Sequence, residues 1–211
     1  MESTHNQGFT LIELLVAIAV LGILLGIGVP SFTEAVKESR ISGQYNTMVG
    51  SLYLARSEAV KGPGQVTVCP RKSDDPDQCG TKDDWSNGWI VFIDNTTVAG
   101  ESEANIDTDD LVISIESPLS GSNVIKAIGS STNSASDAEE VAFVRYLQDG
   151  GTLWNSGTFA VCDTNRGSAS SRAINLVLTG DIRRGRIVTG SKAPRDVFNQ
   201  PISDYCPEPS S

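Results

Sequence analysis

The chain divides into three stretches that differ in their pattern of apolar and polar residues. Residues 9–29 read FTLIELLVAIAVLGILLGIGV, an apolar run of 21 residues that contains one charge, Glu13. At a rise of about 1.5 Å per residue, a helix of this length is about long enough to cross the hydrocarbon core of a bilayer. The run therefore predicts a membrane-spanning helix.

Residues 30–61 predict a continuation of this helix with one apolar face. Apolar side chains recur mostly every three or four residues, the spacing of one helical face, at Phe32, Val36, Ile41, Tyr45, Met48, Leu52, Ala55 and Ala59. The charged residues between them are expected on the wetted side: Glu34, Lys37, Glu38, Arg40, Arg56, Glu58 and Lys61. Pro30 is expected to kink the helix, because proline lacks a backbone donor. Gly62-Pro63-Gly64 is expected to end it.

From Gln65 onward, short β-type runs alternate with turn residues. Strands are predicted near Gln65–Cys69, Trp89–Asp94, Leu111–Glu116, Val124–Ile128, Val141–Tyr146, Thr158–Cys162, Ala173–Leu178 and Arg186–Thr189. Residues 62–211 are long enough to bury a core of their own. The predicted fold class is therefore α+β, with a long N-terminal helix packed on an antiparallel β-rich globular head.

Composition excludes several kinds of function. The chain has 26 acidic and 16 basic residues, a net charge of −10, which argues against whole-surface affinity for nucleic acid. The chain has a single histidine, His5, which argues against catalytic sites that need an imidazole base. The four cysteines contain no Cys-x-x-Cys pair of the kind that holds zinc. We therefore expect neither an enzyme nor a cofactor.

The N-terminus differs from a secretory signal peptide. Residues 1–8 hold no Lys or Arg, and the apolar run ends in GIGVP without a small-residue cleavage site. The apolar segment is therefore expected to stay on the mature protein. Glu13 is costly in hydrocarbon, so it either stays protonated near a membrane edge or meets a positive charge. A cut between Gly8 and Phe9 would create such a charge, a new α-amino group.

The sequence Gly-Phe-Thr-Leu-Ile-Glu at 8–13, followed by an apolar helix, resembles the class III signal of type IV pilins and type II secretion pseudopilins. The resemblance implies cleavage after Gly8 by prepilin peptidase and N-methylation of Phe9. It also implies that Glu13 pairs with a neighbouring subunit's N-terminus during assembly. The leader departs from the family pattern, because it carries His5 where a Lys or Arg is usual.

Three further segments narrow the resemblance to the GspH/FimT family: Leu54–Ala59, Val66–Pro70 and Trp85–Asp94. The family implies a pilin-like fold, divided here into a leader (1–8), a transmembrane helix half (9–29), an amphipathic half (30–61) and a periplasmic head (62–211). Trp85 and Trp89 are expected in core and turn packing, although ligand stacking is the alternative.

An exported head would lie in an oxidising compartment, where an even number of cysteines indicates disulfides. Four cysteines allow three pairings. The preferred one joins Cys69 to Cys79, across an acidic loop, and Cys162 to Cys206, which ties the C-terminal tail to a strand.

Charge is unevenly distributed along the head. Residues 73–149 hold 16 acidic and three basic side chains, whereas residues 150–211 hold five and seven. The basic residues of the last third include Arg183, Arg184, Arg186, Lys192 and Arg195. Some FimT-type minor pilins bind DNA through a C-terminal Gly-Arg-x-Arg motif, so the resemblance makes the three residues Arg183, Arg184 and Arg186 a candidate DNA site. The matching segment here starts at Gly180, and Asp181 replaces its first arginine.

A calcium site is a further alternative. Asn105, Asp107, Asp109 and Glu116 have ligand-like spacing, but Asp110 occupies the position that needs glycine for a sharp turn. A solvated acidic loop is the favoured interpretation, and no metal is expected.

These features predict a minor pilin of a type IV pilus that helps to prime or join pilus assembly. The alternatives are a GspH-type minor pseudopilin of the type II secretion system and a DNA-binding minor pilin for natural transformation. The expected partners are other pilins or pseudopilins, prepilin peptidase, the inner membrane and, in the third case, DNA. The expected location is the inner membrane with a periplasmic head, followed by the pilus or pseudopilus filament.

Overall fold

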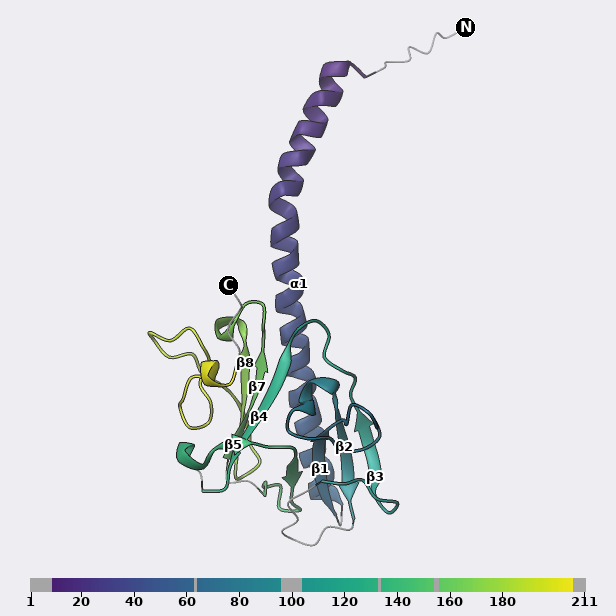
Figure 1. Cartoon of the computed structure of the whole chain (residues 1–211), viewed down its shortest axis with the longest axis vertical. Helices are drawn as coiled ribbons and strands as arrows, with labels where there is room; N and C mark the ends of the chain where they lie inside the picture. The colour runs from purple at the N-terminus through teal and green to yellow at the C-terminus, as the bar shows by residue number, and fades with distance from the viewer. Residues whose placement is uncertain (1–8, 63, 96–103, 133, 154–155, 207–211) are drawn as a thin grey trace. The chain divides into compact units, whose positions relative to one another are not determined.

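A computed structural model describes residues 9–62, 64–95, 104–132, 134–153 and 156–206 (Figure 1). Contacts divide the chain into two compact units, one ending at Ser39 and one beginning at Arg40. The single α-helix of the described residues, α1 (Leu11–Lys61), contributes to both. It continues through Pro30, whose carbonyl accepts a hydrogen bond from the Thr33 hydroxyl at 2.8 Å.

The unit from Arg40 onward contains two antiparallel sheets. The first has the order β3-β2-β1-β6. Its strands are β1 (Gln65–Pro70), β2 (Trp89–Asp94), β3 (Leu111–Ile115) and β6 (Val144–Tyr146). The second has the order β5-β4-β7-β8-β9. Its strands are β4 (Val124–Ser130), β5 (Glu139–Glu140), β7 (Ser156–Cys162), β8 (Arg172–Val177) and β9 (Ile182–Arg184). Four short 3₁₀ turns complete the described elements, η1 (Asp84–Asn87), η2 (Ala135–Asp137), η3 (Ser168–Ser170) and η4 (Ile202–Asp204).

The α+β class and the helix-on-antiparallel-sheet architecture are confirmed, but the last predicted strand is wrong. The chain forms β9 at Ile182–Arg184, and residues 186–189 form no strand. A tight turn is the reason: Gly180 N–H donates to the Val177 carbonyl, and Val177 N–H to the Asp181 carbonyl. This turn sends the chain straight back along β8, so pairing begins at Ile182.

One face of α1 forms the core together with both sheets. Its buried apolar residues are Ile41, Met48, Leu52, Ala55 and Ala59. They belong to one apolar cluster with side chains of β1, β2, β4, β6, β7 and β8. In Figure 1 the part of α1 near its C-terminal end lies along the two sheets. The predicted apolar face is confirmed from residue 41 onward, whereas Phe32, at 70% exposure, lies outside this core.

Both tryptophans singled out in the sequence are buried, as predicted. Trp85 packs edge-to-face against Phe159, with ring centroids 5.0 Å apart, and its indole N–H donates to the Val141 carbonyl at 2.8 Å. The Trp89 indole N–H donates to the Ser51 hydroxyl on α1 at 2.9 Å. Because each indole is enclosed and hydrogen-bonded, both side chains are structural.

Two disulfides form with the predicted pairing, Cys69–Cys79 and Cys162–Cys206. The first lies beside a small apolar cluster on β1 and β2 that includes Ile90 and Phe92. The second joins the end of β7 to the C-terminal tail, where Ile202 is fully buried. The tail therefore has a covalent anchor as well as an apolar one.

We predict that the two disulfides differ in their contribution to stability. In the chain-entropy model a bond that spans 44 residues stabilises by about 4 kcal/mol, and one that spans 10 by about 3 kcal/mol. The double change Cys162→Ala/Cys206→Ala should therefore lower the free energy of unfolding more than Cys69→Ala/Cys79→Ala. Urea denaturation of fragments that begin at Arg40 measures both values. Equal losses, or the reverse order, would contradict the prediction.

Candidate functional site

The N-terminal end of α1 is organised by a capping interaction. Thr10 precedes the helix, and its hydroxyl accepts a hydrogen bond from the Glu13 N–H at 3.3 Å. A Thr followed three residues later by Glu is the signature of a capping box. The Thr-Leu-Ile-Glu sequence has this signature. A pattern of apolar positions does not reveal it, because the capping box depends on two polar side chains. The capped turn holds Glu13 at the start of the helix.

This part of α1 is apolar and long enough to cross a membrane, and none of its most apolar window is buried. Phe9 is 86% exposed. Glu13 is exposed too, and its carboxylate makes no ion pair among the described residues. Charged side chains within membrane-spanning segments usually pair with another charged group or with backbone carbonyls. His5 and Gly8, and with Gly8 half of the predicted cleavage site, lie outside the described residues.

Arg56 connects α1 to the second sheet. Its guanidinium donates to the Gly150 carbonyl at 3.0 Å, to the Thr179 carbonyl at 2.8 Å and to the Asp181 carboxylate at 3.0 Å. The sequence pattern placed Arg56 on the wetted side of the helix, which is wrong, because its side chain is only 31% exposed. Asp181 is therefore engaged by Arg56.

The turn that Arg56 binds needs glycine. Gly180 has a φ of 75°, which favours glycine, and a Cβ there would collide with the Gly150 carbonyl oxygen. Gly150 has a φ of 78°. Two glycine turns thus bring carbonyl groups within reach of one guanidinium, whose five N–H groups can satisfy several acceptors at once.

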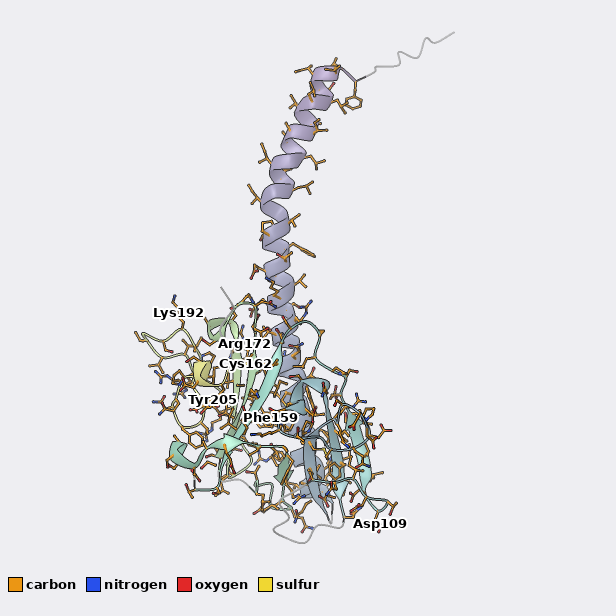
Figure 2. The ribbon with its side chains drawn as sticks, in the orientation of Figure 1. Asp109, Phe159, Cys162, Arg172, Lys192 and Tyr205 are labelled. Atoms are coloured by element: carbon orange, nitrogen blue, oxygen red, sulfur yellow. A yellow bond between two sulfur atoms is a disulfide. The ribbon has the colours of Figure 1, made fainter. Side chains whose placement is uncertain are left out.

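The three predicted DNA-contacting residues lie together at one cavity. Arg183 and Arg184 belong to β9, Arg186 follows it, and all three are exposed. The cavity has a volume of about 530 Å³, and Arg195 and Asn175 also line it. In Figure 2, Arg172, Lys192 and Tyr205 mark the neighbouring strand, loop and tail. The geometry thus assembles a basic cavity from β8, β9 and the tail.

The wall of this cavity is built around Asp196, which is 3% exposed. Its carboxylate accepts hydrogen bonds from the N–H groups of Phe198 and Gln200 and from the Tyr205 hydroxyl. Burial raises the pKa of Asp196 above its ordinary value, although these three donors act in the opposite direction. Burial, together with Asp196, raises the pKa of Tyr205. The tail that holds Arg195 is therefore fixed by a buried carboxylate.

The residues considered for calcium make other contacts. The Asp110 carboxylate accepts hydrogen bonds from the N–H groups of Asn95 and Asp107, and that of Glu116 from the Ser114 hydroxyl. Within the described part of the chain, no group of three acidic, histidine or cysteine side chains could hold a metal ion. The remaining candidates, Asn105, Asp107 and Asp109, lie on an exposed loop before β3.

Two family models match the chain. Residues 44–180 match the model described as type II transport protein GspH, and residues 3–29 match the prokaryotic N-terminal methylation motif. The chain belongs to the GspH family. Its matched part includes Trp85, Trp89 and Arg56, but it ends before Arg183, Arg184 and Arg186.

The curated relatives of this GspH-family chain are pilins. The type IV major pilin protein PilA of Myxococcus xanthus is 26% identical over 152 residues, which cover 72% of this chain and 64% of PilA. Fimbrial protein EcpC of Eikenella corrodens is 43% identical over 45 residues, 21% of this chain and 29% of EcpC. The type IV major fimbrial protein FimA of Dichelobacter nodosus is 36% identical over 60 residues, 26% of this chain and 38% of FimA. The chain thus spans less than two thirds of the length of each of these relatives.

Among solved structures, the minor pilin FimU of Pseudomonas aeruginosa is similar at a TM-score of 0.45 and 19% identity, with 74% of this chain and 92% of that chain covered. These values are too low to support an argument about function. The predicted resemblance to the GspH and pilin families is confirmed by the family models and the curated relatives. The family consists of structural proteins.

Replacement of Arg56 by lysine tests its role in the GspH-family head. A lysine ammonium keeps the charge but cannot reach all three acceptors, so Arg56→Lys should cost about 1–3 kcal/mol of unfolding free energy. The matched control is Lys61→Arg, because Lys61 pairs with Glu58 on the exposed helix surface. Such a surface change should stay within about 0.5 kcal/mol. Urea denaturation measures both, and equal effects would show that the Arg56 contacts are dispensable.

Asp196 predicts a dependence of stability on pH. The pKa of Asp196 is raised in the folded state. Its contribution to the free energy of unfolding is therefore fully present below the unfolded-state pKa of about 4, and it is lost as pH rises through the folded-state pKa. The uncharged Asp196→Asn variant should lack this loss. The stability of the natural chain should therefore fall relative to the variant as pH rises above about 4. Urea titrations at several pH values test this, with exposed Asp109→Asn as control, and parallel curves would refute it.

Proposed function

We propose that the chain is a minor pilin, a subunit that enters a type IV pilus through its N-terminal helix and helps to prime or join assembly. One observation carries the proposal: a capped, exposed, apolar helix end that holds a single carboxylate, Glu13, with no ion-pair partner among the described residues. The match to the methylation motif at residues 3–29 and the pilin relatives support it.

In this proposal, prepilin peptidase cleaves between Gly8 and Phe9, and the new Phe9 amino group is methylated. The chain first spans the inner membrane once, with its head in the periplasm, and then leaves the bilayer for the filament. Glu13 would meet the amino terminus of a neighbouring subunit in an apolar environment. Losing one partner of such a desolvated pair costs about 3–5 kcal/mol. Because the pair forms only when neighbouring helices are correctly aligned along their axes, it favours that alignment.

A GspH-type pseudopilin of the type II secretion system is the alternative, because the same N-terminal motif and family serve it equally well. Deletion of the gene separates the two. For a minor pilin, we expect surface pili to be reduced at least tenfold with secretion of enzymes unchanged. Normal pili with enzymes trapped in the periplasm would reject the minor-pilin assignment in favour of the pseudopilin.

Glu13→Gln, expressed in the deletion strain, tests the mechanism. The amide keeps the shape but removes the charge, so we expect piliation to be restored at least tenfold less well than by the natural chain. Glu34→Gln is the matched control, because Glu34 pairs with Lys37 on the same helix at 2.8 Å. Protein abundance in the membrane is measured in parallel. Full piliation with Glu13→Gln would overturn the proposed role of this carboxylate.

DNA binding is a second candidate function, favoured by the gathering of Arg183, Arg184 and Arg186 at one cavity. It predicts binding that weakens steeply as salt is raised and that is lost when the three arginines are changed together. The net charge of −10 weighs against it.

A further inference from the structure

We infer that the basic cavity receives carboxylates from the head of a second copy of this chain, at a surface here called the acidic face. The acidic face comprises five exposed aspartates, Asp74, Asp75, Asp77, Asp107 and Asp109. The inference rests on the proposed function, because an assembly is what would bring two heads together. It adds a contact between heads to the contact between helices.

The cavity is suited to carboxylate groups. Four arginines line it, and the Asn175 and Asn199 amides add further donors. Arg195 donates to the Asn199 carbonyl at 2.8 Å. A planar guanidinium matches a carboxylate with two parallel hydrogen bonds. The cavity therefore presents more donors than the head itself satisfies.

The acidic face is one continuous surface built from two loops. Asp74, Asp75 and Asp77 lie in the loop closed by Cys69–Cys79, and the other two lie before β3. Gln78 joins the loops: its amide donates to the Ile106 carbonyl at 3.3 Å and accepts from the Ile106 N–H at 3.4 Å. Two basic side chains lie on the first loop: Lys72 pairs with Asp74 at 3.4 Å, and the Arg71 guanidinium donates to the Pro76 carbonyl at 2.9 Å. The face thus stays strongly negative.

The two surfaces lie at different ends of the head. The acidic face adjoins β3, an edge strand of the first sheet, and the cavity adjoins β9, an edge strand of the second. Figure 2 shows Asp109 and Tyr205 on opposite sides of the head. A copy cannot fold its own acidic face into its own cavity, so the contact is heterologous. Heterologous contacts that do not close on themselves propagate into filaments.

A protein carboxylate fits these observations better than duplex DNA. The cavity is concave, so a side-chain carboxylate on a loop can enter it, whereas the phosphates of duplex DNA lie on a convex surface. The contact between copies also pairs the negative and the positive region of one sequence. Exposed ion pairs are individually weak. Heads held side by side by their helices have the high effective concentration that makes weak contacts count.

The experiment uses full-length copies with two different tags in the native cells. In one copy, Ile187 is replaced by a photo-crosslinking phenylalanine, because Ile187 is 60% exposed and adjoins Arg186. We expect crosslinks to the second copy at residues 74–77 or 107–109, located by mass spectrometry. Asp75→Lys/Asp109→Lys in the second copy should lower the yield at least tenfold. Glu139→Lys, an exposed acid outside the acidic face, should leave it unchanged.

A charge swap completes the test. Arg183→Glu/Arg186→Glu in the first copy should also abolish the crosslink, and combination with Asp75→Lys/Asp109→Lys in the second should restore it. Crosslinks to another protein, to a different part of the second copy, or none at all would overturn the inference. Salt-dependent binding of duplex DNA to the full chain in detergent, lost with Arg183→Glu/Arg186→Glu, would overturn it in favour of DNA. Pili are counted in the same cells. If pili depend on the protein but the crosslink is absent, the inference is refuted and the proposed function stands.

Discussion

The packing of one helical face against two separate sheets determines the arrangement of everything else in the unit from Arg40 onward. Among the described strands, none pairs from one sheet to the other, so the sheets are held together by side chains. Leu52 and Ala55 are fully buried between them. Trp85 reinforces the junction by packing on Phe159 of the second sheet. Loss of this apolar contact would separate the sheets, because no ladder of backbone hydrogen bonds replaces it.

The same helix positions the candidate site through a polar contact. Arg56 is next to Ala55 in the sequence, and it binds the turn that precedes β9. β9 carries Arg183 and Arg184, which line the basic cavity. Arg56, which lies within the residues matched by the GspH model, thus orients Arg183 and Arg184, which follow the matched segment. The tail completes the cavity because Cys206 is bonded to Cys162 of β7, and the Asn175 amide of β8 donates to the Arg195 carbonyl at 3.2 Å.

Periodicity and turn residues predicted the helix and most strands, because these depend on local pattern. Both disulfides were predicted from the even number of cysteines in a head expected to be exported, where four cysteines allow three pairings. Arg56 was misplaced because a helical wheel shows which residues share a face but not which turns approach it from elsewhere in the chain. The strand predicted at residues 186–189 failed for a related reason. Ile187 and Val188 have β propensity, yet the Gly180 turn had already set the pairing of β8 with Ile182–Arg184. The cavity itself arises from residues distant in sequence, and no single segment indicates it.

Two electrostatic contacts in the proposed assembly act in different solvents, and this gives them different roles. A pair formed by Glu13 with an amino terminus among apolar helices is hardly screened by salt, and its geometry is strict because desolvated charges tolerate little misalignment. Contacts between the acidic face and the basic cavity lie in water, where screening acts over about 8 Å at physiological ionic strength. The helix contact can therefore supply strength and axial register. The head contact supplies direction, since like surfaces of two heads repel and only unlike ones attract.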